Sequence, residues 1–238
     1  MIIPAHITFT GIDAKTDIDE LVAIQREYPI AEFGVLTSYH WNENGNRYPD
    51  PMLVTELLRG RGLNLSLHLC GRAAHDATMG EWGKIDARMF NNLDLFRRIQ
   101  LNVATRKDNP ERIAGTPNKR TEVIIQQRGG NTALFGSSVW LGEEESKRVS
   151  MLLDASGGNG IDTPLEIFDS TSKIGYAGGI SPDNVAEKLS FLLDNIKRGE
   201  FWIDMESGVR TDDWLDLSKV RQVLAICKEV IEKKGGEK

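Results

Sequence analysis

The sequence of 238 residues has few of the residue types that form disulfide frameworks or hold metal ions. Its two cysteines, Cys70 and Cys227, lie far apart, so a reduced cytoplasmic protein is the simplest interpretation. The four histidines are scattered, without a pair at helical spacing, and no Cys-x-x-Cys motif occurs. We therefore expect no bound metal and no cofactor.

Long apolar runs and an excess of positive charge are also absent. No segment approaches the roughly 18 consecutive apolar residues of a membrane-spanning helix. The first residues, MIIPAHITFTG, lack the basic region of a signal peptide and are typical of a first strand. The net charge of −6 argues against nucleic acid as a partner. We expect neither a membrane nor a nucleic acid as partner, and the sequence carries no signal for a particular oligomeric state.

Short apolar runs alternate with amphipathic helical patterns along the chain. Eight of these runs predict strands, at 7–11, 32–38, 63–70, 98–104, 122–128, 150–154, 173–177 and 201–205. Apolar residues at intervals of three and four predict helices at 17–27, 51–59, 182–197 and 217–231. Alternating strands and helices favour parallel strands joined by right-handed crossovers.

The length of the chain suits one (β/α)8 TIM barrel, which typically has about 250 residues. We therefore expect an α/β fold with eight parallel strands, as a single domain over 1–238 with a frayed tail over 232–238. The segment 109–120 is rich in Pro, Asn and Gly. It predicts an irregular connection between the fourth and fifth strands.

Alternation within the expected strands shows which side chains point into the barrel. In 63–70 leucines alternate with polar residues, and the outer face of a barrel strand must be apolar because it packs against helices. Ser66, His68 and Cys70 should therefore point inward. The same rule turns further polar residues inward: Thr8, Thr10, Gln100, Asn102, Asp154, Asp204 and Glu206. Those at strand ends surround the carboxyl-terminal mouth, where such barrels place their chemistry.

The last two expected strands each end in a glycine turn. The first of them stops at Gly178 and Gly179, and we expect Ser181 to be the N-cap of the next helix and Pro182 its first residue. The second is followed by the Glu-Ser-Gly turn at 206–208. Backbone N–H groups and a helix N-terminus at such a corner can hold an anion, which predicts a phosphate site.

These segments resemble, in order, the motifs of the phosphoribosylanthranilate isomerase family, the tryptophan-pathway barrels that perform an Amadori rearrangement. TFTGID at 8–13 is similar to the family's K-I-C-G-I-T, and NRYPDP at 46–51 to its S-x-R-Y-I-S-P loop. LLD at 152–154 matches the end of its sixth strand. AGGISPDNV at 177–185 resembles S-G-G-L-x-P-x-N-V, and IDMESGV at 203–209 resembles V-D-V-S-S-G-V.

The resemblance implies a role for several residues. Asp154 would be the general acid that protonates the ring oxygen as the sugar opens, and Arg47 would hold the substrate. The phosphate would lie on the backbone N–H groups of Gly178, Gly179, Ser207 and Gly208.

The chain departs from the family where the reaction needs its base. Thr10 stands at the position of the family's base, a cysteine, and a threonine hydroxyl has no ionised form near pH 7 that could replace it unaided. His68 and Cys70, at the inner mouth, are the candidate replacements. The candidate catalytic residues are therefore Asp154, His68, Cys70 and Thr10.

A second departure affects the phosphate site. Glu206 replaces the first serine of S-S-G and brings a carboxylate to the expected phosphate cradle. Two anions a few ångströms apart repel by several kcal/mol at low dielectric unless a cation lies between them. We expect Arg210 to be that cation and count it among the phosphate-binding residues.

Three functions fit these residues. The first is an intramolecular isomerase of the aldose–ketose or Amadori type, acting by general acid–base catalysis on a phosphorylated sugar or its amine adduct. The alternative is a barrel that has lost this chemistry and binds a phosphorylated metabolite or a protein. A second alternative is an aldolase or lyase on the same scaffold. A small phosphorylated molecule is the expected substrate of the enzyme.

Overall fold

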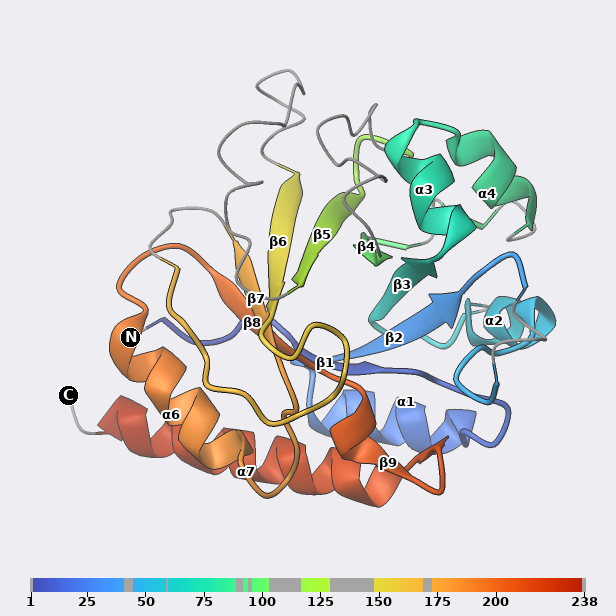
Figure 1. Cartoon of the computed structure of the whole chain (residues 1–238). Coiled ribbons are helices and arrows are strands. Elements are labelled where there is room, and N and C mark those ends of the chain that lie inside the picture. The colour runs from blue at the N-terminus through green and yellow to red at the C-terminus, as the bar shows by residue number, and fades with distance from the viewer. Residues whose placement is uncertain are drawn as a thin grey trace.

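The computed structural model describes residues 2–40, 45–58, 60–88, 92–93, 96–102, 117–128, 148–168 and 173–236. Eight parallel strands close a barrel in chain order, and the last pairs with the first (Figure 1). The strands are β1 (Ile7–Thr10), β2 (Ala31–Thr37), β3 (Leu65–Cys70), β4 (Arg98–Asn102), β5 (Glu122–Arg128), β6 (Val149–Asp154), β7 (Ile174–Ala177) and β8 (Phe201–Met205). The predicted α/β barrel of eight parallel strands is confirmed.

Six helices of the described residues lie outside the barrel, along the strands β1 to β3, β7 and β8. They are α1 (Ile18–Glu27), α2 (Pro51–Leu58), α3 (Arg72–Thr78), α4 (Trp82–Arg88), α6 (Val185–Asn195) and α7 (Leu217–Gly236). Figure 1 shows α1, α6 and α7 together on one side, where α7 packs against both of the others. A 3-10 turn, η4 (Ser207–Val209), leads from β8 into a small hairpin of β9 (Arg210–Thr211) and β10 (Trp214–Leu215).

The apolar stripes of the helices cover the outside of the barrel. Asp17 caps α1 by accepting hydrogen bonds from the N–H groups of Asp19 and Glu20, as the sequence of a helix start predicts. Leu21 and Ile24 of α1 are fully buried. On α7, the buried face includes Val220, Val223, Leu224 and Cys227.

The start of α6 differs from the prediction. Ser181 and Pro182 lie in a turn before the helix, which begins at Val185 with Asn184 as its N-cap residue. The side chain of Asn184 accepts a hydrogen bond from the N–H of Ser181 and donates one to the carbonyl of Gly179. This amide closes the turn, so the prediction of Ser181 as N-cap and Pro182 as first helical residue is wrong.

The carboxyl-terminal tail also differs from the prediction. Helix α7 continues to Gly236, and the ammonium group of Lys234 binds the carboxylate of Asp194 at 2.6 Å. Residues 232–236 are therefore helical and not frayed, while 237–238 lie outside the described residues.

Two connections between strands bear on the site. Residues 103–116 lie outside the described part, so the irregular connection predicted between β4 and β5 stays a prediction. The described part of the β6–β7 connection, residues 155–168, contains no helix. It is fixed to α6 because Lys188 binds the carboxylate of Asp162 and the carbonyl of Thr163, both at 2.7 Å.

Buried charges fill the barrel below its mouth. Arg98 pairs with Glu32 at 2.6 Å, and its guanidinium lies 4.3 Å from the ring centre of Trp202. Lys173 pairs with Glu122 at 3.0 Å. Trp202 also belongs to a small apolar cluster with Ile124 and Leu152, and Leu152 of this cluster lines the pocket at the mouth.

Candidate active site

A pocket of about 280 Å³ opens at the carboxyl ends of the strands. The strand-end side chains that alternation turned inward all line it: Thr10, His68, Cys70, Gln100, Asn102, Asp154, Asp204 and Glu206. The late glycine turns meet at the same pocket through Gly178, Gly179, Ser207 and Gly208. These residues come from the five strands β1, β3, β4, β6 and β8 and from the turns after β7 and β8, and they surround one polar cavity, as the barrel geometry predicts.

Asp154, the last residue of β6, is held firmly at this mouth. Its Oδ2 atom accepts a hydrogen bond from the side-chain amide of Gln126 at 2.9 Å. Its Oδ1 atom accepts two more from Ser156, from the N–H at 3.1 Å and from the hydroxyl at 2.8 Å. Since only 5% of Asp154 is exposed, its carboxyl group is oriented by these bonds and not by solvent.

Asp204, near the end of β8, has a different environment. One of its oxygens accepts a hydrogen bond from the Thr10 hydroxyl at 2.7 Å. Burial raises the pKa of the Asp204 carboxyl to about 8, with a smaller contribution in the same direction from the charges of Glu206 and Glu32. The pocket thus holds one carboxyl group with three donors and another that keeps its proton up to about pH 8.

His68 lies deeper, on β3, and is 1% exposed. Burial, together with the positive charge of Arg98, lowers the pKa of the His68 ring to about 3. Its Nε2 atom is 3.0 Å from the Ser66 hydroxyl, and no described residue bonds to Nδ1. The ring is therefore neutral at pH 7 and accepts a proton weakly.

Cys70 ends the same strand and is only partly buried. The side-chain amide of Asn102 donates to its Sγ atom at 3.3 Å. Tyr48 lies beside it, and burial together with the charge on Cys70 raises the pKa of the Tyr48 hydroxyl above its usual range. Cys70 is thus placed at the pocket wall, as predicted.

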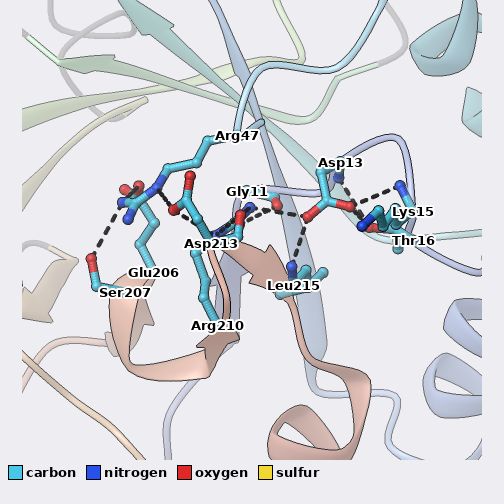
Figure 2. A network of polar contacts seen from close by, with 10 residues as sticks. All are labelled: Gly11, Asp13, Lys15, Thr16, Arg47, Glu206, Ser207, Arg210, Asp213 and Leu215. Carbon is cyan, nitrogen blue, oxygen red and sulfur yellow. Dashed lines mark hydrogen bonds and ion pairs between the residues drawn. The ribbon is translucent and has the colours of Figure 1, made fainter. Parts of the chain in front are cut away.

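Arg47 reaches the pocket from the loop after β2 and is already paired (Figure 2). Its Nη1 atom binds the Glu206 carboxylate at 2.6 Å and the Ser207 hydroxyl at 3.3 Å. Its Nε atom binds the Asp213 carboxylate at 2.8 Å. Arg47 is therefore the cation beside Glu206, and it lies across the turn where the phosphate is expected.

Arg210 does not have the predicted position. Its guanidinium is buried, bonding to the carbonyl of Gly11 at 2.6 Å, the carboxylate of Asp13 at 3.0 Å and the carbonyl of Asp213 at 2.6 Å (Figure 2). It joins the loop after β1 to the β9–β10 hairpin and is not among the residues that line the pocket. The prediction that Arg210 neutralises Glu206 at a phosphate is therefore corrected.

The glycine turns bring backbone to the pocket surface. Gly179 has a φ of +62°, and a Cβ atom there would lie 2.3 Å from the backbone nitrogen of Asp162. A Cβ atom at Gly208 would lie 2.0 Å from the carbonyl oxygen of Ile180. Only glycine fits at either position, because the backbone of a neighbouring turn packs directly against it.

The loop after β6 forms part of the wall at this corner. Gly158 and Gly160 line the pocket, and a Cβ atom at Gly160 would lie 2.8 Å from the Ser207 hydroxyl. The contact between Gly160 and Ser207 therefore brings the β6–β7 connection against the turn after β8.

The pocket also contains residues that were not among the predicted site residues, of which Gln126 and Tyr48 are two polar examples. Gln126 lies on β5 two residues after Ile124, so the alternation used for the other strands would have placed it inside. Tyr48 lies in a loop, where no periodicity shows the direction of a side chain.

The charges around the pocket are mainly acidic. Among the described residues that line it, Asp154, Asp204 and Glu206 carry carboxyl groups, whereas Arg47 is the permanent cation and no lysine is present. No group of three metal-ligating side chains occurs in the described ranges. None of the helices described here is both long and apolar enough to cross a bilayer.

Comparisons with known proteins agree with the motifs. Residues 134–225 match the family model of N-(5'-phosphoribosyl)anthranilate isomerase. The structure is similar to that of N-(5'-phosphoribosyl)anthranilate isomerase from Pyrococcus furiosus, with a TM-score of 0.51 and 16% sequence identity over 94% of this chain and 98% of that one. At this identity the structural likeness establishes the fold. No curated protein sequence matches the chain.

Proposed function

We propose that this barrel, a divergent relative of the phosphoribosylanthranilate isomerase family, is an isomerase for a phosphorylated sugar or its amine adduct. The observation that carries the proposal is a pair of carboxyl groups, Asp154 and Asp204, in contrasting environments at one polar pocket. Two carboxyl groups in different environments can take part in different proton transfers within one pocket.

The reaction needs an acid at an oxygen and a base at a carbon. Asp154 protonates the ring oxygen while the bond from this oxygen to the first carbon breaks and the nitrogen lone pair forms a double bond to that carbon, which leaves a protonated imine and a hydroxyl group. A base then removes the proton from the neighbouring carbon, and the resulting enol rearranges to the ketose. Each such step contributes roughly 10²–10⁴-fold to the rate.

The glycine corner supports the choice of a phosphorylated substrate. Gly178, Gly179, Ser207 and Gly208 lie together at the pocket, and glycine is required at two of these positions. Arg47 lies beside them, so an incoming phosphate would exchange with Glu206 for the same guanidinium.

The substitution Asp154→Asn tests this proposal. We expect it to reduce turnover of N-(5'-phosphoribosyl)anthranilate by at least 10²-fold, because the amide cannot donate an acidic proton. Binding should change little, since the amide is isosteric and still accepts the hydrogen bonds from Ser156 at its oxygen. Chromatographic analysis of the product and calorimetric measurement of binding check the two parts; wild-type turnover retained by the variant contradicts the role of Asp154.

A second candidate is a barrel that binds a phosphorylated ligand without converting it. It is favoured by one observation, the threonine at the position of the family's base. It predicts that a sugar phosphate raises the melting temperature and is recovered unchanged. The aldolase alternative in its Schiff-base form lacks support, since no lysine lines the pocket within the described residues.

A further inference from the structure

We infer that Asp204 is the base that removes the proton from carbon, and that Thr10 is the residue that positions its carboxylate. This inference rests on the proposed function, because it names a group for the step that the missing cysteine leaves open. It differs from the hypothesis drawn from the sequence, in which His68 or Cys70 acts as the base in place of the family's cysteine.

The geometry places Asp204 one hydrogen bond from the missing base. β1 pairs with β8, with Thr8 opposite Asp204. Thr10 lies two residues further along β1, and its hydroxyl donates to Asp204 Oδ1 on the neighbouring strand at 2.7 Å. Both residues line the pocket, so a carboxylate oxygen lies within hydrogen-bond distance, 2.7 Å, of the hydroxyl that stands where the family has its thiol.

The remaining oxygen of Asp204 is available for the substrate. Within the described ranges, the Thr10 hydroxyl is the one hydrogen-bond partner of the Asp204 carboxyl. Asp154, in contrast, has both oxygens occupied by Gln126 and Ser156. A base needs a free lone pair directed at the proton that it removes, and Asp204 retains one.

The acidity of Asp204 matches the task. Burial raises the pKa of its carboxyl to about 8, close to the pH at which a base works most effectively. The charged groups that act on it are Glu206 and Glu32, which raise the pKa, and Arg98, which lowers it. The Thr10 hydroxyl also lowers the pKa, because it donates to the ionised form.

The other candidates fit the step less well. Burial leaves the His68 ring with a pKa of about 3, and its Nε2 atom already faces the Ser66 hydroxyl. The Cys70 thiol receives an N–H from Asn102 and lies two strands away from Thr10. Neither thus occupies the position of the family's base.

The proton-transfer step balances with groups present on the chain and the substrate. Asp204 carboxylate takes the proton from the carbon beside the protonated imine and becomes a carboxylic acid. The electrons of the broken C–H bond form a carbon–carbon double bond, and those of the carbon–nitrogen double bond move to nitrogen and neutralise it. The enol then takes a proton at the first carbon and gives one up from its hydroxyl, which yields the ketone.

The pH profile of the reaction tests this assignment. With N-(5'-phosphoribosyl)anthranilate, we expect kcat/KM of the wild-type protein to rise with pH to a midpoint near 8, as Asp204 ionises in the free protein. Asp204→Asn should lower kcat by roughly 10²–10⁴-fold. Thr10→Val should move the midpoint to higher pH, because the carboxylate loses its donor.

Controls separate this role from a structural one. Thr121→Val removes an equally buried hydroxyl, which donates to the Phe96 carbonyl at the opposite end of the barrel, and should leave the midpoint unchanged. If Asp204→Asn does not fold, the shift of the pH midpoint in Thr10→Val still tests whether Asp204 is the base. A variant of either residue with the wild-type profile overturns the assignment.

A titration that needs no substrate completes the test. Infrared difference spectra between wild-type protein and Asp204→Asn should show one carboxyl group that ionises near pH 8. If the Asp204 carboxyl is already ionised at pH 6, the assignment of Asp204 as the base is contradicted, while the proposed function is not. Wild-type protein that converts no phosphorylated sugar amine, while this carboxyl group titrates as expected, contradicts the proposed function itself.

Discussion

At the scale of single residues, Glu206 replaces a serine of the related family's motif and adds a carboxylate to the pocket. The carboxylate lies at the turn after β8 and is neutralised by Arg47 at 2.6 Å, which is itself shared with Asp213. A phosphate entering the corner must therefore separate this ion pair.

Glu206→Ser should strengthen phosphate binding. The substitution restores the serine of the related family and releases the Nη1 atom of Arg47 for the ligand. Two unit charges at about 4 Å interact by about 1–4 kcal/mol near a protein surface, so we expect a decrease in Kd for ribose 5-phosphate of about tenfold or more. Isothermal titration calorimetry measures it.

The matched control for this experiment is Asp183→Ser. It removes the same charge from an exposed residue in the turn before α6, so it should alter Kd by less than twofold. Equal Kd values for Glu206→Ser and the wild-type protein refute a phosphate site at this corner.

At the scale of elements, a buried ion pair fixes the hairpin β9–β10 to the loop after β1. Arg210 and Asp13 have 3% and 0% of their side chains exposed. Asp13 Oδ2 also accepts a hydrogen bond from the N–H of Leu215 at 2.7 Å. Because Asp213, which binds Arg47, belongs to the same hairpin, this pair also supports the pocket wall.

Arg210→Met should destabilise the fold strongly. Removing one partner of a buried ion pair costs about 3–5 kcal/mol, since the other charge remains without its counterion. The control Arg221→Met breaks exposed pairs with Glu20 and Glu27 and should cost far less, because surface ion pairs contribute little to stability. Urea denaturation measures both; similar losses in the two variants would argue against a structural role for Arg210.

The strands could be read from the sequence, whereas the ion pairs could not. β5 and β8 have the predicted bounds. Alternation correctly placed His68, Asp154 and Asp204 inside the barrel, because the pattern of period two is local and the outer face of each barrel strand must be apolar. The partners of Arg47 and Arg210 depend on how the hairpin after β8 folds back, which no local pattern determines. The late start of α6 accompanies a turn that is closed by two side-chain hydrogen bonds of Asn184, with Ser181 and Gly179.

At the scale of the whole molecule, Asp204 links the site to stability. Its carboxyl has a pKa of about 8 in the folded chain and an ordinary value of 3.8. Between these values the folded state binds one proton more than the unfolded state. The free energy of unfolding therefore falls, through this group, as the pH rises from about 4 to about 8.

Asp204→Asn should remove this dependence. We expect the variant to gain stability relative to the wild-type protein as the pH rises from 5 to 8, with no further gain above pH 8. Guanidinium denaturation at four pH values gives the comparison. A constant difference across this range would mean that Asp204 ionises normally in the folded chain.

The most direct test of the account is to follow N-(5'-phosphoribosyl)anthranilate with the protein in deuterated water by proton NMR. We predict that the sugar proton on the second carbon disappears, that a ketose forms, and that one deuterium appears on its first carbon. A substrate that raises the melting temperature of the protein but keeps all its carbon-bound protons would contradict the account.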